Sequence, residues 1–216
     1  MIKKLSVLGD SVSTYYGMSN NKEACSSTQY NPSRYFKRHF PVENTYWHII
    51  MEKYGLSLCV NNSWSGGNLS GRDNPDSGVC RAAHLSRDNG EMPDFIILFM
   101  GLNDLGRNVD PEVFGRDYEY ALLTIKERYP QATVCCVNLP DRDIALKSRA
   151  IIFNEAIENA VKNAGDGFFV ADLFNSKLNN DTFYNNTIDG LHPDQDGMRM
   201  IAEVISEAMD KHMHNE

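Results

Sequence analysis

Five short apolar runs, most of them separated by helical patterns, constrain the fold of this chain more than any other feature. The runs cover Ile2–Leu8, Ser57–Asn61, Phe95–Met100, Thr133–Asn138 and Gly167–Val170. Continuous apolar runs of roughly four to eight residues are typical of strands that are buried on both faces, and such strands occur mainly in parallel sheets. The sequence therefore predicts a five-stranded parallel sheet with helices on both of its faces.

Apolar residues recur at helical spacing between and after the later runs. This spacing predicts helices over Trp47–Tyr54, Val113–Tyr129, Ala145–Ala164 and Asp196–Met213. In the third of these helices, the face that is expected to be buried carries Ile152, Ala156, Ala160 and Ala164.

Two long segments, Val12–Asn44 and Gly66–Gly90, show neither pattern and are expected to be loops. Loops of this length in a compact domain are often functional. In an open parallel sheet the ligand crevice lies beyond the carboxyl ends of the strands. Because Ser11, Ser65–Gly67 and Asn103 all follow such ends, we expect the chemistry at one edge of the sheet.

The charge balance and the hydropathy pattern exclude several classes of partner. Lys and Arg number 21 and Asp and Glu number 29, which gives a net charge of -8. An acidic chain without a basic cluster is not expected to bind nucleic acid or an anionic membrane surface. No apolar run approaches the roughly 20 residues that a membrane-spanning helix needs. The oligomeric state is left open.

The cysteines indicate a reducing compartment. They are Cys25, Cys59, Cys80, Cys135 and Cys136. An odd count favours free thiols, and the first apolar run is too short for a signal peptide, so a cytoplasmic location is expected. Cys59, Cys135 and Cys136 fall in predicted strands and are expected to fill the core. No Cys-x-x-Cys spacing indicates a zinc site.

The tripeptide Gly9-Asp10-Ser11 directly follows the first predicted strand. A serine at this position can expose its hydroxyl at the sheet edge, as a nucleophile requires. The same tripeptide is also compatible with a turn or a helix cap. It is not the Gly-x-Ser-x-Gly elbow of α/β-hydrolases, because residue 13 is serine.

The segment Asp189-Gly190-Leu191-His192-Pro193 offers a base and a carboxylate to orient it. Asp189 precedes His192 by three residues, so one short loop can present both side chains to the same place. A histidine base needs such a carboxylate to fix its tautomer. Pro193 restricts His192 to an extended backbone. The alternative for this segment is a plain surface turn before a helix.

Two further segments contain donors for a developing oxyanion. Gly66 or Gly67 can bring a backbone N–H close to a substrate without a side chain in the way. Asn103, in Gly101-Leu102-Asn103-Asp104, can donate from its side-chain amide. Each segment alone is also compatible with an ordinary turn. Together with Ser11 and His192, they complete the inventory for ester hydrolysis through an acyl-enzyme.

The four segments together resemble the sequence blocks of the SGNH hydrolases, also called the GDSL-motif lipase/acylhydrolase superfamily. In the family's order they are Gly9–Ser11, Asn61–Gly66, Gly101–Asp104 and Asp189–Pro193. The resemblance spans nearly the whole chain and implies one domain over residues 1–216 with a flavodoxin-like three-layer α/β/α fold. The chain departs from the family pattern at Leu102, where Thr or Ser is usual, and at Gly67, where Asp is commoner.

The resemblance also implies a role for each site residue. Ser11 is the nucleophile and its N–H the first oxyanion donor, while the Gly66 N–H and the Asn103 side chain are the other two donors. His192 is the base, and Asp189 orients it. The implied reaction is hydrolysis of a small-molecule ester through an acyl-serine, without a metal or an organic cofactor.

The identity of the ester is open at this level. We expect a short acyl group, acetyl, on a carbohydrate-like alcohol, because no long apolar groove is evident. The alternatives are a lysophospholipase or thioesterase acting on longer acyl chains, and a non-catalytic flavodoxin-like binding module. A metal-dependent phosphoesterase is disfavoured, since clustered ligands such as Asp-x-His are missing.

Several other side chains have two interpretations. Trp47 and Trp64 either stack on a sugar ring or pack in the interior, and packing is favoured because each buries a large area. Arg72, Arg107 and Arg142 either contact an anionic substrate or are ordinary surface charges, and the sequence favours surface charges.

Overall fold

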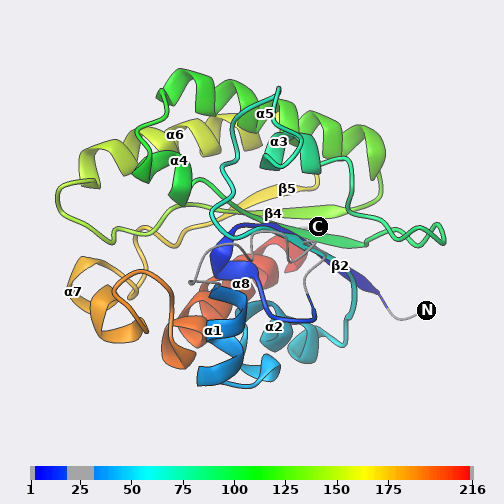
Figure 1. Ribbon diagram of the computed structural model, residues 1–216. Helices are drawn as coiled ribbons and strands as arrows, with labels where there is room; N and C mark the ends of the chain where they lie inside the picture. The colour runs from blue at the N-terminus through cyan, green and yellow to red at the C-terminus, as the bar shows by residue number, and fades with distance from the viewer. Residues whose placement is uncertain (1–2, 19–31, 215–216) are drawn as a thin grey trace.

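Five strands form one parallel sheet, as the apolar runs predicted (Figure 1). The structure is a computed structural model that describes residues 3–18 and 32–214, so Ile2 of the first predicted strand lies outside the described residues. The strands are β1 (Lys4–Gly9), β2 (Ser57–Ser63), β3 (Phe95–Phe99), β4 (Thr133–Val137) and β5 (Phe168–Ala171). Their order across the sheet is β2-β1-β3-β4-β5, and all neighbouring pairs are parallel. This order is that of the flavodoxin-like folds.

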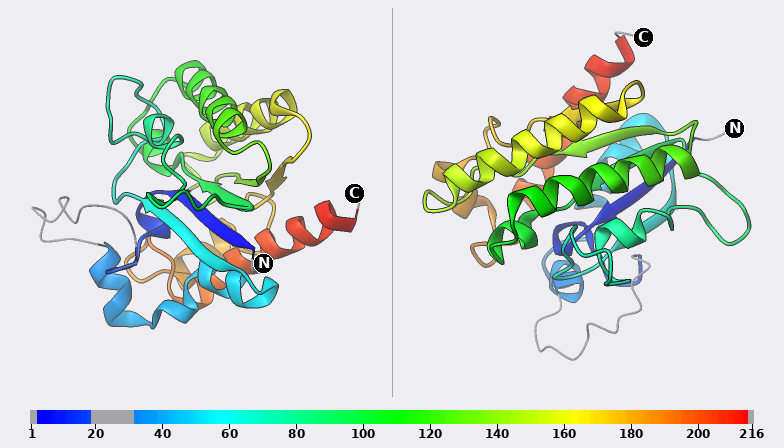
Figure 2. Two further views of the ribbon diagram at one scale, coloured as in Figure 1. Left: turned by 90° about the vertical axis from the view of Figure 1, so that its right-hand side faces the viewer. Right: turned by 90° about the horizontal axis from the view of Figure 1, so that it is seen from above.

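Helices cover both faces of the sheet, which gives the expected three-layer sandwich (Figures 1 and 2). One layer holds α3 (Gly78–Arg81), α4 (Leu102–Gly106), α5 (Pro111–Arg128) and α6 (Lys147–Ala164). The other holds α1 (Pro32–His39), α2 (Tyr46–Tyr54) and α8 (Gln195–His214), with the one-turn α7 (Asn180–Phe183) before α8. None of the helices within residues 3–18 and 32–214 is both long and apolar enough to cross a membrane.

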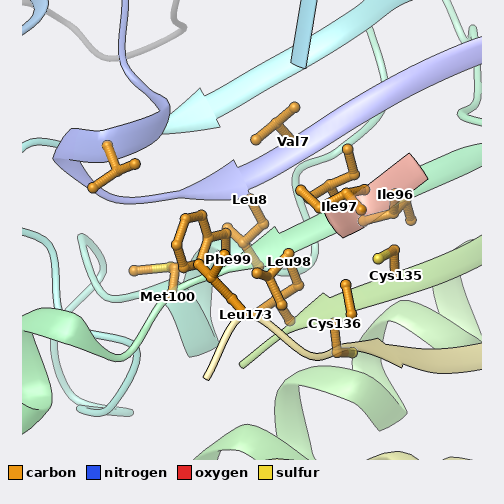
Figure 3. Close-up of a cluster of buried hydrophobic side chains, with 14 of the residues drawn as sticks. Val7, Leu8, Ile96, Ile97, Leu98, Phe99, Met100, Cys135, Cys136 and Leu173 are labelled. Atoms are coloured by element: carbon orange, nitrogen blue, oxygen red, sulfur yellow. The ribbon is translucent and has the colours of Figure 1, made fainter. Parts of the chain in front are cut away.

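The central strands supply the middle of the hydrophobic core. Figure 3 shows Val7–Leu8 of β1 beside Ile96–Phe99 of β3 and Cys135–Cys136 of β4, and all of these residues are buried. Successive side chains of a strand point to opposite faces of the sheet. An unbroken apolar run is therefore the pattern that a sheet covered on both faces requires, which is why these runs predicted the strands well.

The cysteines of the strands fill the core as expected. Cys59, Cys135 and Cys136 are buried free thiols, and Cys80 is a half-buried free thiol. Cys25 lies outside the described residues.

The predicted buried face of α6 is confirmed at Ala160 and Ala164 and wrong at Ile152, while Ala156 is half-buried. Ile152 is exposed, whereas the next residue, Phe153, is buried and stacks on Phe114 of α5 with ring centroids 4.4 Å apart. The buried side chain of Asn154 exchanges hydrogen bonds with the backbone of Leu139, at 2.8 and 2.9 Å. This aromatic stack and these hydrogen bonds bury Phe153 and Asn154 in place of Ile152, and the spacing of aliphatic residues predicts neither contact.

Two segments that were predicted to be loops contain helices. Val12–Asn44 includes the two-turn helix α1, and Gly66–Gly90 includes the single turn α3. In α1 the buried side chain of Phe36 and the chain end at Phe40, which is also buried, provide the apolar anchors. A helix this short shows too few repeats for its period to be recognised, and its stability comes from tertiary packing.

Candidate active site

Ser11 lies just beyond the carboxyl end of β1. The chain leaves β1 at Gly9 and forms a single 3-10 turn, η1 (Ser11–Ser13), and the Asp10 side chain caps the Val12 N–H of this turn. The Asp10 carboxyl accepts the Val12 N–H at 3.0 Å. A side chain at Gly9 would collide with the side chains of Ser13 and Ser63, so glycine is needed for the turn to pack against β2.

The structure brings Ser11, His192 and Asp189 together. Nε2 of His192 lies 3.0 Å from Oγ of Ser11, and Nδ1 of His192 lies 2.8 Å from Oδ2 of Asp189. Because the Asp189 carboxylate is an acceptor only, it holds the ring proton on Nδ1 and leaves Nε2 to accept the Ser11 proton. This is the arrangement of a nucleophile, a base and an orienting carboxylate.

The loop before α8 is built to hold this geometry. Oδ1 of Asp189 accepts the backbone N–H groups of Leu191 at 3.0 Å and His192 at 2.7 Å, so the carboxylate closes its own turn. Gly190 has φ +81°, a conformation that favours glycine. The Ile188 N–H donates to the His192 carbonyl at 2.8 Å and closes the loop behind the imidazole.

Asp189 remains ionised in this loop. Its partial burial acts to raise its pKa, but the hydrogen bonds from the His192 backbone and ring outweigh burial and leave the pKa below its ordinary value. The Phe36 ring of α1 also meets the His192 ring in a T-shaped contact, with centroids 5.9 Å apart. The imidazole thus contacts both a carboxylate and an aromatic ring.

Asn103 joins the other two loops of the site. It lies in α4, directly after β3, and its Nδ2 donates to the Gly67 carbonyl at 3.0 Å and lies 3.3 Å from Oδ2 of Asp10. The amide is therefore tied both to the second loop and to the residue before Ser11.

The turn at Gly66 and Gly67 distinguishes the two candidate donors. The Gly67 N–H donates to the Trp64 carbonyl at 3.0 Å, so it is occupied within the turn. The N–H groups of Gly66 and Ser11 have no acceptor within the described part of the chain. Gly66 is at φ +72°, and its carbonyl is held by the Arg107 guanidinium at 2.7 Å. The geometry therefore favours Gly66 over Gly67 as a backbone donor.

Three residues that the sequence did not single out as supports hold these loops. The buried guanidinium of Arg81 donates to the carbonyls of Gly9, at 3.1 Å, and Asn62. The carboxylate of Asp104 accepts the N–H groups of Leu69 and Ser70, at 2.7 and 2.9 Å. Arg107 supports the Gly66 turn. Asp104 lies inside the motif Gly101–Asp104, which was a signal in the sequence, whereas Arg81 lies in a segment predicted to be a loop and had no such signal.

Burial shifts the titration of Asp10. Its side chain is 1% exposed, and burial raises the pKa to about 7 despite the hydrogen bond from Val12. The negative charge of Asp104 adds to the increase, while the charges of Arg81 and Arg142 oppose it. Asp10 is thus a carboxyl whose proton is lost near neutral pH beside the candidate nucleophile.

This shift predicts a pH-dependent effect of Asp10→Asn on stability. Between the ordinary aspartate pKa of 3.8 and about 7, the folded state binds more protons at Asp10 than the unfolded state does. The free energy of unfolding of the wild type therefore falls across this range as pH rises. The substituted amide still accepts the Val12 N–H but does not titrate, so the variant should gain roughly 4 kcal/mol on the wild type between about pH 4 and pH 8.

Urea unfolding of both proteins at each pH measures this difference. Comparing the two curves removes the contributions of all other titrating groups, including Asp189, whose lowered pKa acts in the opposite direction. If the free energies of unfolding of the variant and the wild type change in parallel with pH, the pKa of Asp10 is not raised in the folded protein.

Comparison with known proteins identifies the family. The sequence model of the GDSL-like lipase/acylhydrolase family matches residues 3–209. A search of curated proteins finds no match.

Solved structures share the fold over nearly the whole chain. A Bacteroides ovatus protein described as a GDSL-like lipase is 23% identical with a TM-score of 0.71, covering 98% of this chain and 99% of that one. A family two carbohydrate esterase from Clostridium thermocellum, in complex with cellohexaose, is 17% identical with a TM-score of 0.70, covering 97% and 64%. Esterase EstA from Pseudoalteromonas, inhibited by monoethylphosphonate, is 14% identical with a TM-score of 0.66, covering 98% and 99%.

These structures share the fold, and the family match rests on the sequence itself. The chain belongs to the GDSL-like lipase/acylhydrolase family of the SGNH hydrolase superfamily, and it is an ester-bond hydrolase.

Proposed function

We propose that the protein is a serine esterase that cleaves a carboxylic ester through an acyl-serine intermediate. The observation that carries the proposal is the pair of hydrogen bonds that links Ser11 Oγ to His192 Nε2, at 3.0 Å, and His192 Nδ1 to Asp189 Oδ2, at 2.8 Å. A serine hydroxyl is a weak nucleophile until a neighbouring base removes its proton. The pair of bonds provides that base in the required tautomer.

In the first step, His192 takes the Ser11 proton as Oγ attacks the ester carbonyl carbon, and the carbonyl electron pair moves to oxygen. The N–H groups of Ser11 and Gly66 are the backbone donors to this oxyanion. Asn103 is the third donor: its Nδ2 donates to the Gly67 carbonyl at 3.0 Å and lies 3.3 Å from Oδ2 of Asp10, and it exchanges the Asp10 contact for one to the oxyanion. The two backbone N–H groups are held in place before the reaction, and such donors stabilise the transition state without the cost of reorganisation.

In the second step, the His192 imidazolium gives its proton to the departing alcohol oxygen, and the acyl group stays on Ser11. His192 then removes a proton from water, which attacks the acyl carbon and releases the acid. The ionised Asp189 stabilises the imidazolium in both half-reactions.

A cavity at the edge of the sheet that carries Ser11 supports a short acyl group on a carbohydrate-like alcohol. It has a volume of about 460 Å³ and lies between the segments that follow β4 and β5, and Ser11 and His192 are not among its lining residues. Its lining combines polar groups with one aromatic ring: Asp141, Ile144, Lys147, Phe174, Asn175, Ser176 and Asn179. Such a lining suits a hydroxylated ligand better than a long acyl chain. The fold that this chain shares with family two carbohydrate esterases also supports the proposal of a carbohydrate-like alcohol.

The two tryptophans do not contribute equally to this argument. Trp47 is fully buried in the core, so it is not a platform for a sugar ring. Trp64 is half-buried and lies under the Arg81 guanidinium, 5.8 Å from its ring centroid.

A fluorophosphonate probe and a panel of esters test the proposal together. We expect one covalent adduct, located on Ser11 by peptide mass spectrometry, and a kcat/KM for acetylated sugars and acetyl esters at least about tenfold above that for octanoyl esters. A non-catalytic binding module would give no adduct on Ser11. A lysophospholipase or thioesterase would give the adduct but a kcat/KM that rises with acyl chain length.

A further inference from the structure

The three arginines that the sequence left open have different surroundings. Arg72 forms an ion pair with Asp117 at 2.6 Å. Arg107 is used by the Gly66 turn, where it also contacts Asn68. The guanidinium of Arg142 forms no ion pair and donates no hydrogen bond within the described part of the chain.

Arg142 lies at the same edge of the sheet as the site. It follows β4, which is the neighbour of β3, so its loop lies next to the segment that carries Asn103. A Cβ placed on Gly106, at the end of α4, would lie 3.8 Å from Nη2 of Arg142. The guanidinium therefore rests over α4, about one helical turn from Asn103.

The environment of Arg142 favours binding of an anion to its guanidinium. The side chain is half-buried, and its Nε is buried with no hydrogen-bond partner among the residues that the structure describes. Burial lowers the pKa of Arg142 from its ordinary value, while Asp143, Tyr184 and Asp10 act in the opposite direction from beyond hydrogen-bonding distance. A partly buried charge that lacks a counter-ion has lost hydration without compensation, and an anionic ligand would restore it.

We propose that Arg142 binds an anionic group, a carboxylate or a phosphate, on the alcohol part of the ester. The inference rests on the proposed esterase function and narrows its substrate to esters of acidic alcohols, such as sugar acids or sugar phosphates. A guanidinium presents a planar fork of donors that matches both of these anions.

The position of Tyr184 assigns the anion to the alcohol rather than to the acyl group. The Tyr184 ring lies 3.7 Å from where a Cβ on Gly190 would be, and Gly190 is in the turn between Asp189 and His192. His192 protonates the departing oxygen, so the alcohol leaves on this side of Ser11. Tyr184 is exposed, and its hydroxyl is close enough to Arg142 to affect the pKa of the guanidinium, so we assign Arg142 to the side on which the alcohol leaves.

Three chromogenic esters test the proposal. They are 4-nitrophenyl acetate, 3-carboxy-4-nitrophenyl acetate, with the carboxylate on the leaving group, and 4-nitrophenyl hemisuccinate, with the carboxylate on the acyl group. We expect the wild type to prefer the second ester over the first. Arg142→Gln should lower this ratio of kcat/KM values by about tenfold or more, since a hydrogen bond to a charged group is lost. Arg142→Lys should keep part of the preference, because it keeps the charge without the fork.

A matched control separates a local contact from a change in net charge. Arg128→Gln makes the same charge change on an exposed side chain at the end of α5, which has run back to the opposite edge of the sheet. In Arg128→Gln, the ratio of kcat/KM for 3-carboxy-4-nitrophenyl acetate to that for 4-nitrophenyl acetate should equal the wild-type ratio. Competitive inhibition by glucuronate and by glucose 6-phosphate, with glucose as the neutral reference, distinguishes a carboxylate from a phosphate ligand.

The outcomes are distinct. The proposal is overturned if the ratio of kcat/KM for 3-carboxy-4-nitrophenyl acetate to that for 4-nitrophenyl acetate is the same in Arg142→Gln as in the wild type. It is also overturned if Arg128→Gln lowers this ratio as much as Arg142→Gln does. If Arg142→Gln lowers kcat/KM only for 4-nitrophenyl hemisuccinate, Arg142 binds an anion on the acyl group, and the assignment to the alcohol is wrong. If Ser11→Ala hydrolyses the esters as fast as the wild type, the esterase proposal itself fails, whatever the ratios. If Arg142→Gln does not fold, Arg142→Lys and the inhibition constants of the wild type carry the test.

Discussion

Ser11→Ala is expected to lower kcat/KM for an acetyl ester by about 10⁵- to 10⁶-fold, because removal of the nucleophile leaves only substrate binding and the oxyanion donors. KM should change far less than kcat. The free energy of unfolding should change by about 1 kcal/mol or less, since one hydrogen bond to His192 is lost at the edge of the sheet. Steady-state kinetics and urea unfolding of the same preparations measure both quantities.

Ser13→Ala is the matched control. Ser13 lies in the same turn as Ser11, but its Oγ hydrogen-bonds to the Tyr46 hydroxyl at 2.6 Å, inside the protein. This variant should lose stability, because it leaves a buried hydroxyl without a partner, yet keep most of its kcat. Ser11→Ala should thus lose activity but little stability, whereas Ser13→Ala should lose stability but little activity. Wild-type turnover in Ser11→Ala would refute the acyl-serine mechanism.

Asp189→Asn is expected to lower kcat by about 10⁴-fold, as loss of the orienting carboxylate does in other serine hydrolases. The amide oxygen still accepts the backbone N–H groups of Leu191 and His192, so the loop stays closed. Its NH₂ group then faces Nδ1 of His192 and favours the tautomer with the proton on Nε2. That nitrogen lies 3.0 Å from Ser11 Oγ and is then unable to accept its proton.

Two measurements separate this effect from general damage. Nitrogen NMR of the His192 ring should find the proton on Nδ1 in the wild type and on Nε2 in Asp189→Asn. Asp194→Asn removes the same charge nearby, where the carboxylate only caps α8 by accepting the N–H groups of Asp196 and Gly197, each at 2.9 Å. Asparagine is an equally good cap, so activity should persist. An unchanged tautomer together with wild-type kcat in Asp189→Asn would remove Asp189 from the mechanism.

The sheet was predictable from local sequence because its strands are buried on both faces. Each of the five apolar runs overlaps one strand, with ends that differ by a few residues. The long helices were predictable for a similar reason, since each repeats its apolar period several times. The short α1 was not predictable, and neither was the burial of Phe153 rather than Ile152 in α6. Both depend on partners elsewhere in the chain.

The sequence motifs predicted the residues of the candidate site but not the contacts between them. The sequence alone determined that a serine, a histidine, an aspartate and an asparagine each follow a strand or occupy a turn. Only the tertiary structure decided that Ser11 and His192, 181 positions apart, lie within hydrogen-bonding distance.

The tertiary structure also decided which of several equivalent groups is left without a partner. The Gly67 N–H donates to Trp64, and neighbours hold the side chains of Arg72 and Arg107. Within residues 3–18 and 32–214, the Gly66 N–H and the Arg142 guanidinium have no such partner. Local sequence determines what a backbone segment and its side chains are able to donate or accept. Whether those groups are already satisfied depends on atoms that folding brings from distant segments, and a site is formed by the groups that folding leaves unsatisfied.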